Sequence, residues 1–274
     1  MSLLESTPRS YAVRSASAVA GLILLAACGV EAGMDADANT LEAQAISSAP
    51  ARTLTVFAAA SLQKPFEQIG KDFEKAHPGV TVKFSFGGSS GLVAQLSDGA
   101  PADVLATANE ATMSKAVAAD LVSDTPAPFV SNTLQIAVPQ DNPAGVTSLA
   151  DLTKPGVKVV LCAPAVPCGA AALSLEKSAS IDIKPVSEEQ SVTDVLGKVR
   201  SGEADAGLVY VTDVAGAGGE VRGIDFPEAK AAINIYPIAA LKAAKDASLA
   251  TEFIGAISGT EGQSVLKAAG FAAP

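Results

Sequence analysis

Three segments of the chain carry small residues, two of them with serine hydroxyls, where a β-rich run gives way to a helix-like pattern. They are residues 58–61 (AAAS), residues 87–90 (GGSS) and the turn that runs from Cys162 to Gly169. The first N–H groups of a helix lack intrahelical partners and carry partial positive charge, so such segments can bind an anion without Lys or Arg. An ordinary helix N-cap is the simpler interpretation of any single serine, whereas several that converge would form a binding site.

The residue types that most enzymes and metal sites require are scarce. The chain has one histidine, His77, which lies in a KAHPG segment that ends a helical pattern. No H-E-x-x-H or C-x-x-C motif occurs, and residues 87–91 lack the Lys-Ser/Thr pair of a phosphate-binding loop. Residues 216–219 (GAGG) lack the spacing of a dinucleotide site. We therefore expect a binding protein that is not an enzyme, uses no cofactor and offers no direct ligands to a metal ion.

The composition is that of a folded, acidic protein. Hydrophobic residues make up 49% of the 274 residues, and because Trp is absent the cores depend on Ala, Val, Leu and Ile. A chain of this length forms one large or two modest domains. The formal net charge of −10 argues against nucleic acid or an anionic membrane surface as the partner, since both bind basic faces.

The N-terminal residues have the pattern of a bacterial lipoprotein signal. Arg9 and Arg14 precede an apolar run at 16–27, which is too short for a transmembrane helix of about 20 residues. The run ends in LAACG at 25–29, a pattern that predicts a signal peptide at 1–27 and lipidation of Cys28. A plain signal peptide with an incidental cysteine, or a short anchor, is the alternative. Residues 28–51 then form a polar tether, and we expect an exported protein with a lipid anchor in the cell membrane, facing outside the cytoplasm.

Two cysteines remain once Cys28 is lipidated, and they favour a disulfide. Cys162 and Cys168 form an even pair in a compartment that is oxidising for an exported protein. Pro164 and Pro167 punctuate the residues between them, so the chain can turn back far enough to bring the two Cα atoms within about 7 Å. The alternative is a pair of buried thiols, with Cys162 simply ending a core strand.

Hydrophobic periodicity predicts that strands and helices alternate along the body of the chain. In the first half, we expect strands at 53–58, 80–86 and 102–107 and helices that start near 61, 89 and 109; the first helix ends at His77-Pro78-Gly79. A second series has strands at 133–138, 157–162, 206–211 and 233–241 and helices near 148–152, after Gly169, at 191–200, 247–257 and 261–268. This order predicts two α/β lobes of mostly parallel sheets flanked by helices, with ligands at the carboxyl ends of the strands.

Four segments, taken in order, resemble the molybdate-binding proteins of ABC importers. They are VFAAASL at 56–62, FGGSSGL at 86–92, GAPADVLATAN at 99–109, and GLVY at 207–210 followed by Thr212-Asp213. The turn at 166–169 (VPCG) is similar to the family's V-P-A-G turn, and the resemblance runs from about Thr53 to the C-terminus. It implies a type II periplasmic-binding-protein fold of two lobes, with the ligand in the interlobe cleft. Lobe 1 would comprise residues 52–132 and 238–274, and lobe 2 residues 133–237, with hinge crossings near 131–135 and 233–238.

The resemblance also implies which residues bind the anion. Ser61 and Ser89 would act as hydroxyl and backbone donors, Cys168 and Val192 as backbone N–H donors, and Tyr210 as a phenolic O–H donor. This chain departs from the family pattern in having Cys rather than Ala at 168, a Gly-Gly pair before the serines, and Val211 after the tyrosine.

The partners that the resemblance implies are a small anion and an importer. The protein would be a monomer that binds molybdate, and also tungstate, and would deliver the anion to a membrane permease driven by a cytoplasmic ATPase. A protein of the same fold for sulfate or a chelated metal is the alternative, and a purely structural lipoprotein is the third possibility.

Overall fold

The computed structural model of the chain describes residues 51–274. The predicted signal peptide, Cys28 and the tether up to residue 50 lie outside the described residues. The described residues belong to one unit, and all that follows concerns this unit. None of the helices formed by the described residues has the length and apolar character needed to cross a bilayer.

The first lobe is built on a five-stranded sheet with the order β2-β1-β3-β10-β4. Strand β1 pairs in parallel with β2 and β3, whereas β10 is antiparallel to its neighbours β3 and β4. Four strands of this sheet therefore run in one direction and β10 opposes them. The bounds are Arg52–Ala59 for β1, Val80–Gly87 for β2, Val104–Ala106 for β3, Ala127–Asn132 for β4 and Asn234–Ala240 for β10.

The second lobe repeats this plan in a sheet with the order β7-β6-β8-β5-β9. Strand β6 is parallel to β7 and β8, and β5 is antiparallel to β8 and β9. The two opposed strands, β5 and β10, are the ones with which the chain enters each sheet after crossing from the other. The bounds are Leu134–Pro139 for β5, Val159–Cys162 for β6, Ser187–Glu189 for β7, Ala206–Tyr210 for β8 and Val221–Ile224 for β9.

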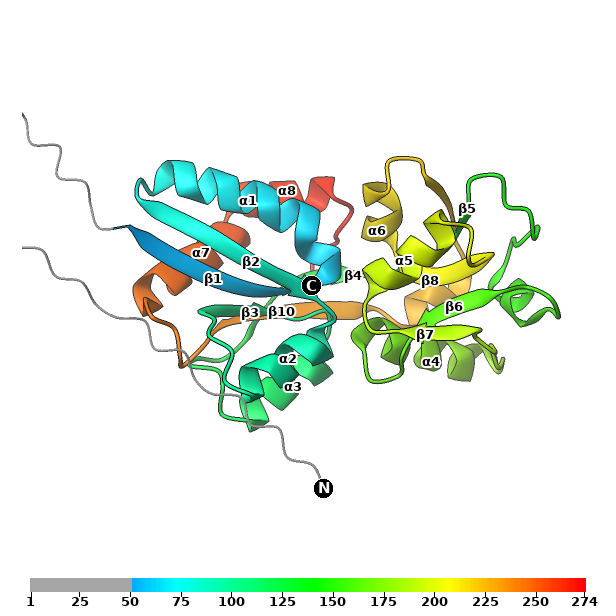
Figure 1. The fold of residues 1–274 in the computed structure, drawn as a ribbon, viewed down its shortest axis with the longest axis horizontal. Coiled ribbons are helices and arrows are strands. Elements are labelled where there is room, and N and C mark those ends of the chain that lie inside the picture. The colour runs from blue at the N-terminus through cyan, green and yellow to red at the C-terminus, as the bar shows by residue number, and fades with distance from the viewer. Residues whose placement is uncertain (1–50) are drawn as a thin grey trace, which may run out of the picture. The chain divides into compact units, whose positions relative to one another are not determined.

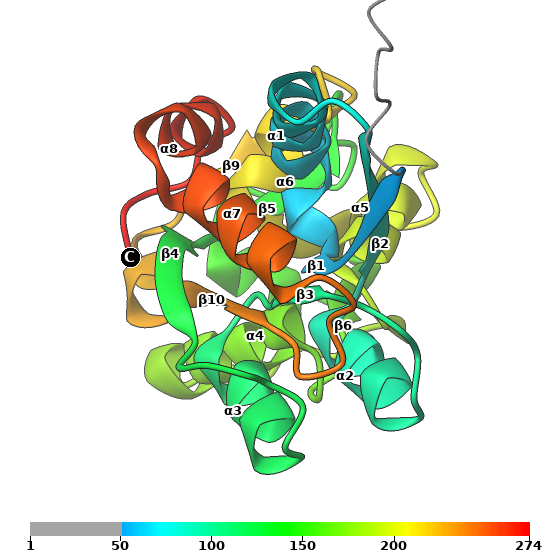
Figure 2. The ribbon, with the colours of Figure 1, turned by 90° about the vertical axis from the view of Figure 1, so that its left-hand side faces the viewer.

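Helices cover both faces of each sheet. Helices α1, α7 and α8 lie on one face of the first sheet and α2 and α3 on the other (Figures 1 and 2). In the second lobe α5 and α6 lie on the opposite side from α4 (Figure 1). The bounds are Gln63–Ala76 for α1, Ser89–Ser97 for α2, Glu110–Ala118 for α3, Pro167–Ala179 for α4, Val192–Arg200 for α5, Val211–Gly216 for α6, Ala247–Ser258 for α7 and Thr260–Ala268 for α8, with 3-10 turns at Ala60–Leu62, Leu149–Thr153 and Pro227–Ala231. The expected two-lobed α/β fold is confirmed.

Helix α1 shows how the apolar spacing builds the first core. Phe66, Ile69 and Phe73 are all buried, as a helical repeat on one face requires. The ring of Phe253 from α7 meets Phe73 edge to face at 5.2 Å and Phe66 at 6.4 Å. The helix ends at Ala76, and Gly79 continues the chain with a φ of 89°, which explains the stop that the sequence predicts.

The chain passes between the lobes twice, and a buried hydrogen bond joins the lobes at the first crossing. Thr133 alone separates β4 from β5, and the Asn132 side chain donates to Thr212 Oγ1 of the second lobe at 2.8 Å. The return runs between β9 and β10. The expected lobe boundary at 238 falls inside β10, because residues 234–237 already pair with β4.

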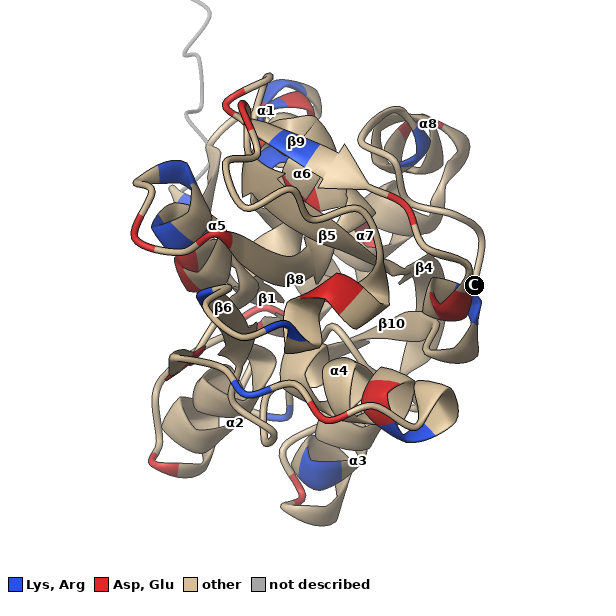
Figure 3. Ribbon diagram, turned by 90° about the vertical axis from the view of Figure 1, so that its right-hand side faces the viewer, with Lys and Arg blue, Asp and Glu red and all other residues tan. Residues whose placement is uncertain are grey.

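Charged side chains gather on the outer helices and loops. In the view onto the second lobe, strands β5 and β8 carry no charged residue, while α3, α4, α5 and β9 do (Figure 3). Strands β5 and β8 therefore bring no charged side chain to the interior of the second lobe.

A disulfide closes the turn between β6 and α4. Cys162 ends β6, Cys168 is the second residue of α4, and their Cα atoms are 5.7 Å apart. The bridge that the sequence predicts is therefore present. Helix α4 begins at Pro167, before the expected start after Gly169, so that Cys168 lies inside its first turn.

We expect an unfolded, unreduced Cys28→Ala chain to show no thiol that reacts with a titrant. Reduction should lower the free energy of unfolding by less than about 3 kcal/mol, because the closed loop is much shorter than 15 residues. Urea unfolding with and without reductant measures this loss, and a Cys162→Ser/Cys168→Ser double variant should not respond to reductant. Two reactive thiols in the unreduced chain would contradict the bridge.

Candidate functional site

One small cavity lies where the strand ends of both lobes meet. Its volume is about 10 Å³, too small for a sugar or a nucleotide. Its lining includes all five residues that sequence analysis assigns to the site. The twelve lining residues are Ala59, Ala60, Ser61, Gly87, Gly88, Ser89, Ala108, Val166, Pro167, Cys168, Val192 and Tyr210.

The two lobes contribute to the cavity through equivalent turns. In the first lobe Ser61 follows β1 and Ser89 follows β2; in the second lobe Cys168 follows β6 and Val192 follows β7. Tyr210 is the last residue of β8. Because both sheets have the same strand order, the carboxyl ends of corresponding strands face the same cavity from opposite sides.

Helix starts around the cavity leave backbone donors without side-chain caps. The N-cap residues are Ala59 for the 3-10 turn, Gly88 for α2 and Val166 for α4, and none of them makes a side-chain capping bond. At α5 the Ser191 side chain accepts from the N–H of Asp194, at 3.3 Å. The N–H groups of Ser89, Cys168 and Val192 lie in these first turns without intrahelical or capping partners, and all three residues line the cavity.

Two of the three hydroxyl groups at the cavity already accept a hydrogen bond from the protein. Ser89 Oγ accepts from the N–H of Ala108 at 3.0 Å, and Tyr210 Oη accepts from Asn234 Nδ2 at 2.9 Å. The Ser89 hydroxyl therefore keeps its own hydrogen for a ligand. Ser61 Oγ shares a buried hydrogen bond of 2.9 Å with Tyr236 Oη.

A buried polar network that sequence analysis did not predict orients these hydroxyls. Asn234 Nδ2 also donates to the carbonyl of Ala108 at 2.7 Å, and the Tyr210 and Tyr236 rings meet edge to face at 5.9 Å. Asn234 and Tyr236 both come from β10, far along the chain from Ser61 and Ala108. The signal that could have revealed this network is a polar Asn234 inside the otherwise apolar run at 233–241.

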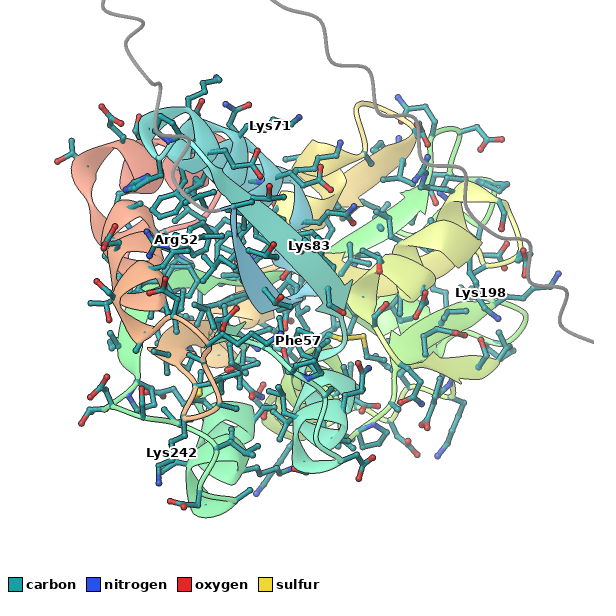
Figure 4. The ribbon with its side chains drawn as sticks, turned by 60° about the vertical axis from the view of Figure 1, so that its left-hand side comes forward. Arg52, Phe57, Lys71, Lys83, Lys198 and Lys242 are labelled. Atoms are coloured by element: carbon teal, nitrogen blue, oxygen red, sulfur yellow. A yellow bond between two sulfur atoms is a disulfide. The ribbon has the colours of Figure 1, made fainter. Side chains whose placement is uncertain are left out.

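The cavity is electrically neutral but rich in hydrogen-bond donors. None of its lining residues, all of them within the described part of the chain, has a charged side chain. Burial raises the pKa of Tyr210 well above its ordinary value and raises that of Tyr236 as well, so both phenols keep their protons. The surface cations Lys71, Lys198 and Lys242 project at the outside of the molecule (Figure 4). Residues 51–274 contain no cluster of three or more His, Cys, Asp or Glu side chains that could hold a metal ion.

One buried carboxyl group, Asp213, lies directly behind the site. Its Oδ2 atom accepts from the N–H of Tyr210 at 2.9 Å, and burial raises its pKa from 3.8 to about 7. Burial disfavours the charged form because the carboxylate loses its water shell. Asp213 therefore carries a proton for much of the time near neutral pH, which limits the negative charge next to the cavity.

We expect Asp213 to destabilise the protein as the pH rises. The folded state binds the Asp213 proton more tightly than the unfolded state, so the stabilisation is complete below about pH 4 and is lost as the pH rises through about 7. Asp213→Asn keeps an oxygen for the Tyr210 N–H and cannot ionise. As the pH rises, the free energy of unfolding of Asp213→Asn should therefore increase relative to that of the native chain. The increase should be at most about 1.4 kcal/mol per pH unit, and a few kcal/mol in all. Urea unfolding from pH 4 to 8 measures this, and two parallel stability curves would contradict it.

Comparison with known proteins agrees with this architecture. The family model of the bacterial extracellular solute-binding proteins matches residues 54–272. The molybdate-binding protein ModA of Mycobacterium tuberculosis is 45% identical over 260 residues, which cover 95% of this chain and 96% of that protein.

Solved structures share the fold at lower identity. The periplasmic molybdate-binding protein of Azotobacter vinelandii matches with a TM-score of 0.69 at 22% identity, over 81% of this chain and 99% of that one. The sulfate-binding protein SubI of Mycobacterium tuberculosis matches with a TM-score of 0.68 at 20% identity, over 80% and 86%. The two scores are nearly equal, so the fold alone does not select the anion. With a family model that spans almost all of the described residues and a close relative of matching length, this chain belongs to the bacterial extracellular solute-binding proteins.

Proposed function

We propose that this protein captures molybdate outside the cytoplasm and delivers it to the permease of an ABC importer. The observation that carries the proposal is a small neutral cavity lined by Ser61, Ser89, Cys168, Val192 and Tyr210, with hydrogen-bond donors from both lobes. The 45% identity to a protein named as molybdate-binding supports the same ligand. Tungstate, which is nearly the same size and charge, would bind in the same way.

The chemistry of the donors suits a fully ionised dianion. Hydrogen bonds to a charged acceptor are shorter and stronger than neutral ones, and neutral donors avoid the cost of burying Lys or Arg. Phosphate keeps a proton near pH 7 and would need an acceptor at the cavity. The Ser89 and Tyr210 oxygens already accept bonds from Ala108 and Asn234, which favours an anion without a proton.

Sulfate is the second candidate, because it has the same charge and tetrahedral shape. The near-equal structural match to a sulfate-binding protein favours it as the alternative. Sulfate is smaller than molybdate, so two rigid lobes set for molybdate would hold it with longer hydrogen bonds. Size is then the property that discriminates.

The remaining parts of the proposal concern the setting of the protein. The signal pattern at 1–27 and LAACG at 25–29 support export and lipidation of Cys28, so that a tether holds a monomer at the outer face of the membrane. Capture and release of an anion need no covalent step and no cofactor, and we infer that the chain has no catalytic activity.

We expect isothermal calorimetry to give about one molybdate per chain, with tungstate similar and sulfate much weaker. A ligand that binds only the folded state raises the melting temperature, so a thermal-shift panel of molybdate, tungstate, sulfate and phosphate should rank the anions in the same order. No heat with molybdate would refute the assignment, and equal affinity for sulfate would favour the second candidate.

We expect Ser61→Ala, Ser89→Ala and Tyr210→Phe each to weaken molybdate binding by about 1.5–3 kcal/mol, or roughly 10- to 150-fold. Each change removes one hydroxyl donor to a charged acceptor. Ser174→Ala, an exposed serine on α4, is the matched control and should bind normally. If the site hydroxyls only support the fold, the melting temperature will fall while the affinity of the folded protein stays unchanged.

A further inference from the structure

Gly88 occupies a position where no side chain fits, and the obstacle comes entirely from the other lobe. A Cβ atom at residue 88 would lie 1.9 Å from the carbonyl oxygen of Gln190, 3.1 Å from the Gln190 carbonyl carbon and 3.5 Å from Val166 Cγ1. Gly88 precedes α2 in the first lobe, whereas Gln190 and Val166 belong to the second lobe. The nearest obstacles therefore exist only while the two lobes are closed.

The backbone of Gly88 does not itself require glycine. Its φ of −63° and ψ of 129° are values that any L-residue adopts without strain. Space, and not conformation, is what glycine supplies here. This separates Gly88 from glycines with positive φ, such as Gly99, where a substitution would strain the chain within its own lobe.

The Gly88–Gln190 approach is part of a contact zone around the cavity. Beside it, Ser90 Oγ donates to the carbonyl of Ala165, again from the first lobe to the second. Elsewhere along the interface the Lys64 ammonium group donates to the carbonyl of Gly216. These contacts use backbone carbonyls of the second lobe, which cannot move aside as a flexible side chain could.

We propose that Gly88 is a positioning residue for the anion: its missing Cβ lets the lobes close far enough for donors from both to reach one ligand. This rests on the proposed anion-binding function. Gly88 directly precedes Ser89, and Gln190 lies two residues before Val192, so the approach of the two backbones sets the separation of two donor groups. Gly88 lies in the Gly-Gly pair by which this chain departs from the family pattern.

The distances explain why a single methyl group would matter. Real Cβ atoms stay more than about 3 Å from a carbonyl oxygen, so alanine at 88 would push the backbones apart by about 1 Å or more. Hydrogen bonds hold their donor–acceptor distances within about 0.5 Å and weaken steeply beyond it. An anion held by one lobe would then lose good bonds to the other.

The matched pair Gly88→Ala and Gly91→Ala tests this inference. Gly91 lies in the same helix and is exposed, and a Cβ atom there would have no neighbour within 4 Å. For Gly88→Ala we expect at least about a tenfold loss of molybdate affinity by calorimetry, the size of one charge-assisted bond. The ligand-free melting temperature should stay near that of the native chain, because the obstacle lies outside the first lobe. Gly91→Ala should bind molybdate as the native chain does.

Small-angle X-ray scattering supplies a readout that a change in folding alone would not move. Molybdate should reduce the radius of gyration of the native chain and of Gly91→Ala by the same amount. The reduction should be smaller for Gly88→Ala. Native affinity with full compaction in Gly88→Ala would overturn the inference, as would a loss of ligand-free stability that matches the loss in binding. If Gly88→Ala binds molybdate as tightly as the native chain does, the inference about Gly88 is overturned and the proposed function stands. If the native chain binds none of the anions, both are overturned.

Discussion

A buried N–H group without a hydrogen-bond partner costs about 1–3 kcal/mol, and the closed cavity gathers such groups from helix starts in both lobes. Gly88, Val166 and Ala59 begin their helices without side-chain caps, and the residues after them line the cavity. Only a ligand that accepts hydrogen bonds from several directions can pair with the free donors of both lobes at once. Binding and closure are consequently a single event, because the ligand stabilises the one arrangement in which both sets of donors meet.

The crossing strand β10 connects this event to the hinge. It enters the first sheet against the direction of the other strands, and its first residues supply Asn234 and Tyr236. Asn234 bonds Tyr210 of the second lobe, and Tyr236 bonds Ser61 of the first. The same strand that lets the chain pass between the lobes therefore also orients a donor on each side. A change in the angle between the lobes would alter the bond between Asn234 and Tyr210 directly.

Long periodic segments could be predicted from the sequence, because their apolar spacing is set by the face they bury. Helix α1 and strand β2 are examples, and the disulfide followed from the number of cysteines and the intervening prolines. Strands β7 and β9 and helix α6 have six residues or fewer, too few to establish a period. The polar network and the Gly88–Gln190 approach depend on residues far apart in sequence, which only the folded chain brings together. The five site residues came from the family resemblance, since hydroxyl spacing alone fits ordinary helix caps as well.

The acidic surface repels a negatively charged ligand, whereas the donors of the neutral cavity attract it. A chain with a formal net charge of −10 repels an anion at long range, although salt at physiological strength screens this repulsion beyond about 8 Å. The attraction must then come from short-range dipoles, which act only after the anion has entered and water has left. Lobe closure strengthens them, because hydrogen bonds gain energy as the surrounding dielectric falls. The depth of closure, and not the charge of the protein, is therefore the property on which capture depends.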